Sequence, residues 1–257
     1  MKKLLYAVAA IVVSLSAVSC SEEAKSTSVE PMNIEFWEVC DYQLVGELST
    51  FFYEGHADAL VIDGLKASGK SHSAPLSTLI LPEYPFVSPN GVVITWPVGF
   101  NFVMAADASN VDTISEYLEL EPVKAELERI TGGSVKFAWS RKNTLNEAGD
   151  GVYVLYALQG FGGLYPAMDG TGIVEAKAVP STFNDTYEVS ITFDDKASME
   201  WGRLTQRNIG RNIAIVGNGR VIVNPVVNGP ISGGRVTLSG NFTQAEAEAL
   251  AKSINAN

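Results

Sequence analysis

The segment from Asn208 to Ala251 constrains the fold more than any other part of the chain. Its turn residues and helix-cap residues mark where each strand and helix begins and ends. Alternating apolar residues from Ile213 lead into the turn Gly217–Gly219, and glycine and asparagine tolerate the positive φ that a tight reversal needs. The return strand stops at Pro225, which has no amide donor and favours a strand end. This part of the segment predicts a β-hairpin.

A third strand and a helix follow the hairpin. After the break at Gly233–Gly234, Val236 and Leu238 share one face of a predicted strand. Thr243 and Glu246 have the spacing of a capping box, in which each side chain bonds the other residue's backbone amide. The residues that mark the buried face of the predicted helix are Ala247, Leu250, Ala251 and Ile254.

This order of strands, turns and cap resembles the end of the first periplasmic head domain of SecD and SecDF, the accessory membrane subunits of the bacterial protein-export translocase. The matching residues are Asn208, Ile209, Gly210, Ile213 to Val216, Gly219, Pro225, Gly233, Gly234, Gly240, Phe242 and Thr243. The chain departs from the family pattern at Asn218, where the family usually has Asp, and at Val223-Asn224, where it usually has Ser-Ala. The resemblance implies a SecD head-like fold and no catalytic residues.

The resemblance extends towards the N-terminus with fewer matching residues. Residues Ile34 to Glu38 look like the LEFWE-type strand that opens this region in SecDF proteins of the Bacteroides type, and similar segments follow in the same order. The resemblance does not cover the segment from Gly55 to Val98. We therefore expect residues 32–140 to form the N-terminal part of a SecDF head-like region and residues 141–257 to form the head-like C-terminal module.

The N-terminus has the pattern of a lipoprotein signal peptide. Two lysines, an apolar run from Leu4 to Ala17 and small residues before Cys20 predict a signal peptide over residues 1–19, with lipid attached to Cys20. An ordinary secretory signal is the alternative. Residues 20–31 are polar and aperiodic, which predicts a flexible tether. The protein would then lie in the cell envelope, on the outer membrane or cell surface if it comes from a Bacteroides relative.

No second apolar run of about eighteen residues occurs after Cys20. In SecD and SecDF the proton-coupled work is assigned to charged residues within the membrane helices. The resemblance therefore implies a head domain without energy coupling.

Charge and cysteine content exclude some functions. The net charge is −11, and removal of Lys2 and Lys3 with the signal peptide brings it to −13. This acidic balance argues against a nucleic-acid partner, whose binding would need a basic face. With Cys20 lipidated, Cys40 is the remaining thiol, so no internal disulfide is expected, and Cys40 is predicted to be a small buried residue.

Periodicity predicts an α+β fold, with a mixed, largely antiparallel sheet covered by helices. The predicted strands are 34–39, 92–96, 100–104, 135–139, 152–158, 173–179 and 187–193. The predicted helices are one capped by Asp41, then 111–118, then 122–130 opened by Pro122, and one capped by Asp194 or Asp195 that ends at Gly210. The four tryptophans, which are predicted mainly as core with an exposed minority as the alternative, are Trp37, Trp96, Trp139 and Trp201.

One motif has the spacing of a phosphate-binding loop. Gly64–Ser71 reads GLKASGKS and follows the strand-like run Ala59–Asp63. Phosphate binding requires a helix that starts at the final Gly-Lys-Ser, and Pro75 follows too soon for that helix. We expect a polar surface loop and no nucleotide.

Other catalytic patterns are weak. His56 and His72 are the only histidines, which leaves little for a metal cluster or a serine triad. His56 with Asp58 has two potential ligands, but a solvated turn after Gly55 is favoured. Asp194 and Asp195 are more typical of a helix cap than of an acid–base pair. No metal site and no cofactor is predicted.

Three hypotheses on function remain. The leading one is a lipid-anchored, non-enzymatic binding module of the SecD head type. It would bind unfolded polypeptide, the translocase or an envelope complex during export. Binding would bury an apolar segment in a groove or along a sheet edge. The second is a structural or interaction lipoprotein that keeps the fold without an export role. An enzyme is third, and would need a cleft that joins a histidine to a serine or carboxylate.

Overall fold

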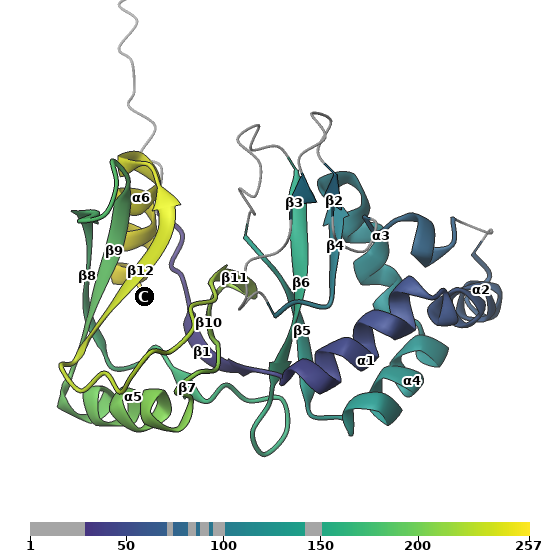
Figure 1. Cartoon of the computed structure of the whole chain (residues 1–257), viewed down its shortest axis with the longest axis horizontal. Coiled ribbons are helices and arrows are strands. Elements are labelled where there is room, and N and C mark those ends of the chain that lie inside the picture. Colours follow the sequence, from purple (N-terminus) through teal and green to yellow (C-terminus); the bar gives the residue numbers. More distant parts are fainter. Residues whose placement is uncertain (1–28, 71–73, 82–85, 88–92, 95–100, 142–150) are drawn as a thin grey trace, which may run out of the picture.

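The computed structural model describes residues 29–70, 74–81, 86–87, 93–94, 101–141 and 151–257. Central strands lie between a group of helices from the N-terminal half and a smaller sheet with two helices from the C-terminal half (Figure 1). The predicted signal peptide, Cys20 and most of the predicted tether lie outside the described residues. The helices are α1 (Tyr42–Tyr53), α2 (His56–Ala67), α3 (Ala108–Leu118), α4 (Glu121–Thr131), α5 (Asp195–Arg207) and α6 (Gln244–Asn255), with a 3-10 turn η1 (Leu76–Thr78).

The central sheet is antiparallel and is built around β1 (Ile34–Val39) and β6 (Val152–Gln159). The other strands of this sheet are β4 (Met104–Asp107), β5 (Val135–Trp139), β7 (Met168–Asp169), β10 (Ile213–Gly217) and β11 (Arg220–Val223). One edge of β1 pairs with β10, and its other edge pairs with the end of β6 and with β7. Strands from both halves of the sequence therefore share one sheet.

The central sheet curls until its ends meet. Ser140, directly after β5, forms a parallel bridge with Val221 of β11, and the Arg141 amide donates to the Val221 carbonyl at 2.7 Å. The ring β1–β6–β5–β11–β10 encloses an apolar interior because strand side chains alternate between faces. The interior residues are Trp37, Val39, Ala105, Ala138, Val154, Tyr156, Leu158, Ala214, Val216 and Val221.

One polar group of contacts lies beside Trp37 on the same faces of β1 and β5. The Trp37 indole donates to the Glu35 carboxylate at 2.8 Å, and the Lys136 ammonium reaches the same carboxylate at 3.3 Å. Lys136 also lies over the Trp37 ring, 4.6 Å from its centroid. A buried indole N–H normally finds a partner, and here Glu35 supplies it.

The outer face of the ring is covered on two sides. Helices α1 to α4 pack on the outer face of β4, β5 and β6 and form a core with residues such as Leu48, Ile114, Val123 and Leu155. The second side carries Ile34 and Phe36 of β1 and Ile213 and Ile215 of β10, which join the core of the C-terminal half.

The C-terminal half contains a separate antiparallel sheet in the order β12–β9–β8, made of β12 (Arg235–Phe242), β9 (Tyr187–Phe193) and β8 (Ile173–Pro180). Helix α6 packs on β8 and β9, and α5 packs through Trp201 against Phe36 and Phe193. β8 is an edge strand. The Asn255 side chain of α6 bonds both backbone groups of Ala176 on it, accepting from the amide and donating to the carbonyl at 2.8 Å each.

The structure confirms the α+β class and most predicted elements. Strands 34–39, 135–139, 152–158, 173–179 and 187–193 are present within one residue of their predicted ends. Asp41 and Asp194 cap α1 and α5 by accepting the Leu44 and Ala197 amides at 2.9 and 2.8 Å. Cys40, Trp37, Trp139 and Trp201 are buried, as predicted, and Trp96 lies outside the described residues.

Four predictions were wrong in detail. Ala59–Asp63 is helical, within α2. The strand predicted at 100–104 begins at Met104 and runs to Asp107. The strand predicted at 92–96 is not among these errors, because its described residues form β3 (Val93–Ile94), which pairs with β2 (Phe86–Val87). Helix α4 begins at Glu121, one residue before Pro122, and α5 ends at Arg207 because Asn208 takes the C-cap position.

Candidate functional site

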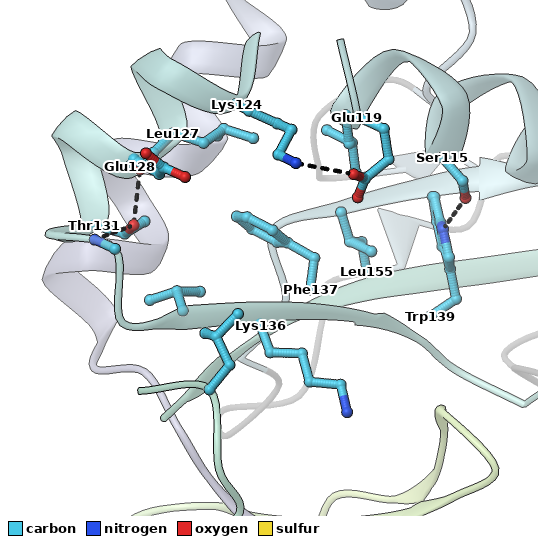
Figure 2. Close-up of a pocket in the computed structure, with 14 residues that line it drawn as sticks. Ser115, Glu119, Lys124, Leu127, Glu128, Thr131, Lys136, Phe137, Trp139 and Leu155 are labelled. Atoms are coloured by element: carbon cyan, nitrogen blue, oxygen red, sulfur yellow. Dashed lines mark hydrogen bonds and ion pairs between the residues drawn. The ribbon is translucent and has the colours of Figure 1, made fainter. Parts of the chain in front are cut away.

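A cavity of about 410 Å³ lies between helices α3 and α4 and strand β5 (Figure 2). The side chains of Leu127 from α4 and Phe137 from β5 border it, and Leu155 of β6 lies behind them. Leu164, from the loop between β6 and β7, also lines it and is 55% exposed. An apolar cavity of this kind, open to solvent beside a sheet, is a typical binding site. We name it the β5 pocket.

Polar side chains surround the β5 pocket. Lys124 of α4 pairs with Glu119 at 3.4 Å at the end of α3. On the other side, the Trp139 indole donates to the Ser115 hydroxyl at 2.9 Å, which fixes the ring at the pocket wall. The apolar surface is thus bordered by polar groups that bond one another.

Strand β5 has an open edge beside the pocket. One edge pairs with β6 from Val135 to Trp139. In the part of the chain that the structure describes, no strand pairs with its opposite edge, and the link to β11 begins only at Ser140. Unpaired backbone groups at a sheet edge accept an added strand. The strand edge and the pocket together offer both backbone and apolar contacts.

A second cavity lies between α1, α2 and α4, with a volume of about 710 Å³. Its lining includes His56, Phe51 and the Glu126–Arg129 pair, whose atoms approach to 2.7 Å. It is a shallower, wider hollow than the β5 pocket and has no strand edge beside it. Among the described residues, the carboxylate that lies beside His56 is that of Glu54, 3.7 Å from the imidazole, and both side chains are exposed to solvent.

The predicted signature residues hold the fold together, and the first of them lies in a buried network. Asn208, fully buried after α5, donates to the Glu38 carboxylate and to the Leu204 carbonyl, both at 2.9 Å. Arg207 reaches the same carboxylate at 2.6 Å and Arg211 lies 4.0 Å away. A buried carboxylate needs such partners. Asn208 therefore fastens the end of α5 to β1.

The other signature residues serve turns and the last helix. Asn218 and Gly219 take positive φ in the hairpin turn, as predicted, and Asn218 also accepts the Asn33 amide at 2.9 Å. Thr243 and Glu246 form the predicted capping box of α6. Gly210 has a φ of 79° and donates to Val227. Gly240 lies within a bulge of β12 between Ser239 and Phe242, and the ring of Phe242 covers it.

The other sequence motifs form no catalytic or ligand-binding arrangement in the described residues. The described part of the phosphate-loop motif, 64–70, begins inside α2 and runs past its C-terminal end, the opposite polarity from a phosphate site, and Gly64 packs against Leu120. Asp58 accepts from the Ser77 amide and hydroxyl at 2.9 and 2.6 Å, while His56 is exposed. His72 lies outside the described residues. No group of metal-binding side chains occurs within the described ranges.

Cys40 is a buried thiol at the end of β1. Burial, and secondarily the Asp41 charge, raises its pKa to about 12. The thiolate is the reactive form, so a thiol in this setting is inert. Cys40 thus serves packing, as the sequence indicates.

The fold defines an α+β domain with a candidate binding site at the β5 pocket, and comparison with known proteins shows which family it resembles. Residues 159–257 match the family model described as SecDF, P1 head subdomain. The chain is 32% identical to the protein translocase subunit SecD of Magnetococcus marinus over 133 residues, which cover 50% of this chain and 24% of that protein. It is 34% identical to SecDF of Thermus thermophilus over 86 residues, which cover 34% of this chain and 12% of that protein.

The chain therefore contains a SecD head-like domain, and it spans a quarter or less of the length of these relatives. A solved SecDF chain, described as a membrane component that enhances protein export, aligns over 87% of this chain and 93% of its own with a TM-score of 0.36 and 15% identity. Within the described residues, no helix has the length and apolar character needed to cross a membrane.

Proposed function

We propose that this protein is a lipid-anchored, extracytoplasmic SecD head-like module that binds polypeptide during protein export and has no enzymatic activity. The match of residues 159–257 to the SecDF head supports the link to export. The pattern around Cys20 supports the lipid anchor. The open edge of β5 beside an apolar pocket is the observation that carries the binding activity.

The binding mode follows from the geometry. An extended segment adds to β5 through backbone hydrogen bonds, and its alternate side chains face the β5 pocket because strand side chains alternate with period two. Burying one Leu- or Phe-sized side chain there stabilises the complex by about 1.5–3 kcal/mol. Backbone bonds are independent of sequence, so the module accepts many unfolded chains with an apolar residue at the pocket.

The test measures binding of a fluorescently labelled, reduced and alkylated unfolded protein by anisotropy. Phe137→Ser removes the apolar wall of the pocket and is expected to weaken binding about tenfold or more, given the burial energy of one large side chain. Leu164→Ser changes an exposed lining residue, so its effect is separable from any loss of folding. Phe183→Ser, which changes a 90% exposed side chain in the β8–β9 loop, is the matched control. Equal affinity in all variants, or no affinity for several unfolded chains, refutes the proposal.

The lipid anchor and the envelope partner are tested in cells. Cys20→Ser is expected to abolish incorporation of labelled fatty acid and to release the protein from membranes. Affinity purification of the lipidated protein separates the proposal from its alternative. Co-purifying translocase or β-barrel-assembly components support the export role, whereas surface structures alone support a structural lipoprotein that keeps the fold.

A further inference from the structure

The corner between α5 and β10 presents basic and apolar side chains together, on a chain whose net charge is −11. We call it the corner patch, and it consists of Phe161, Arg203, Arg207, Ile209, Arg211 and Val226. Arg203 and Arg207 lie one helical turn apart on the exposed side of α5, opposite its buried residues. The patch includes Phe161 from the loop between β6 and β7, the loop that also supplies Leu164 to the β5 pocket, whereas its three arginines come from α5 and the turn after it.

Side-chain and backbone contacts join most members of the corner patch. The Arg207 guanidinium lies over the Phe161 ring, 5.4 Å from its centroid. Arg207 and Arg211 both approach the Glu38 carboxylate, at 2.6 and 4.0 Å. Backbone bridges Ile209–Val227 and Asn212–Val226 bring the loop after β11 alongside. These contacts hold Arg207 against Phe161 and Glu38, and Arg203 extends the patch along α5 one turn before Arg207.

The charge of the corner patch is only partly neutralised. Glu38 supplies one carboxylate to two arginines, and no ion pair of Arg203 occurs in the described part of the chain. The side chains of Arg207 and Arg211 remain 50% and 47% exposed, and Ile209 is 52% exposed. Arginine and aromatic residues are enriched in protein interfaces because they combine apolar contact with bidentate bonding of carboxylates.

We propose that the corner patch is a docking site for an acidic segment of a partner protein that carries apolar residues among its carboxylates. Charge complementarity favours such a segment, whose carboxylates bond the arginines while an apolar side chain covers Phe161 and Ile209. An anionic membrane fits less well, because a broad negative surface repels the rest of this acidic protein. A narrow segment reaches the patch and avoids that repulsion. This inference does not depend on polypeptide binding at β5.

The test uses a fluorescein-labelled synthetic peptide of Glu and Asp interspersed with Leu and Phe, with the purified full chain. We expect saturable binding at low salt that weakens as salt rises, since exposed charges are screened. The matched peptide with Lys in place of Glu and Asp is expected not to bind. The double variant Arg203→Ser/Arg211→Ser should weaken binding about tenfold, and Ile209→Ser should weaken it by a smaller factor. Arg207 is left unchanged because it also stabilises Glu38.

Two controls separate the outcomes. Arg235→Ser removes an exposed arginine from β12 and is expected to leave the affinity unchanged. Phe137→Ser, in the β5 pocket, is also expected to leave it unchanged, so that failure of one proposal does not imply failure of the other. Absence of acidic-peptide binding, an equal effect of Arg235→Ser, or stronger binding to phosphatidylglycerol vesicles than to the peptide overturns the inference.

Discussion

The interaction of Asn208 with Glu38 makes a quantitative prediction about stability. Asn208→Ala removes two hydrogen bonds from a fully buried side chain, one to the Glu38 carboxylate and one to the Leu204 carbonyl. A hydrogen bond to a charged group contributes about 1.5–3 kcal/mol and a neutral one about 0.5–1.5 kcal/mol. We therefore expect the free energy of unfolding to fall by about 2–4 kcal/mol. For a chain of this size, 1 kcal/mol corresponds to about 2–4 °C in Tm.

The assay is urea unfolding followed by circular dichroism, with thermal scans of the same samples. Gln206→Ala is the matched control, since Gln206 lies in the same helix and is exposed, and surface changes of this kind stay within about 0.5 kcal/mol. Asn208→Asp is expected to cost more than Asn208→Ala at neutral pH, because it places a second carboxylate beside Glu38. If Asn208→Ala unfolds at the same urea concentration as Gln206→Ala, the network does not stabilise the fold as we reason.

Three further predictions follow from single residues. Cys40, with its pKa raised by burial to about 12, should resist iodoacetamide at pH 8 in the native protein and react after denaturation, as mass spectrometry of the peptide would show; rapid native labelling would contradict its burial. Burial raises the pKa of Tyr156 from 10.0 to about 12, so its contribution to stability is complete below pH 10 and is lost as pH rises from 10 to 12; Tyr156→Phe should flatten this part of the stability curve. Thr243→Ala, which removes the cap of α6, should cost about 1 kcal/mol in denaturant unfolding, and an unchanged midpoint would show that the capping box is dispensable.

Local rules predicted those elements whose determining residues are close in the sequence. Asp41, Asp194 and Thr243 cap helices through amides three residues away, and Asn218 adopts positive φ in a turn of its own hairpin. In these cases a short segment holds all the atoms that decide the conformation. Sequence reasoning succeeded there because tertiary structure had little to add.

Helix α2 shows why other elements escaped prediction. Its apolar run Ala59–Asp63 is too short to distinguish strand from helix by periodicity. Gly64 in the helix interior also argues against a helix when only propensity is considered. A tertiary contact explains the glycine at this position. A Cβ at Gly64 would lie 2.9 Å from the Leu120 Cβ, so only glycine permits this contact. No pattern within the segment carries that information.

The candidate sites could be recognised only once the order and pairing of the strands were known. The sequence predicted β5 and its two neighbouring helices, but only strand order shows that β5 has an open edge. Likewise, Asn208 was found as a family match, and its partner Glu38 lies 170 residues earlier in the chain. The corner patch joins Phe161 to Arg207 across forty-odd residues by a contact that no local spacing encodes.

The contact of Asn255 with Ala176 has a practical consequence for work with this protein. The side-chain amide bonds the Ala176 amide and carbonyl as a neighbouring strand would, so at this residue the edge of β8 is closed to pairing with another molecule. Protection of this kind matters most for molecules crowded together on a surface. An affinity tag or fluorescent fusion joined after Asn257 would lie two residues from this contact. We therefore expect a tag placed there to disturb the contact and to increase aggregation relative to the untagged protein.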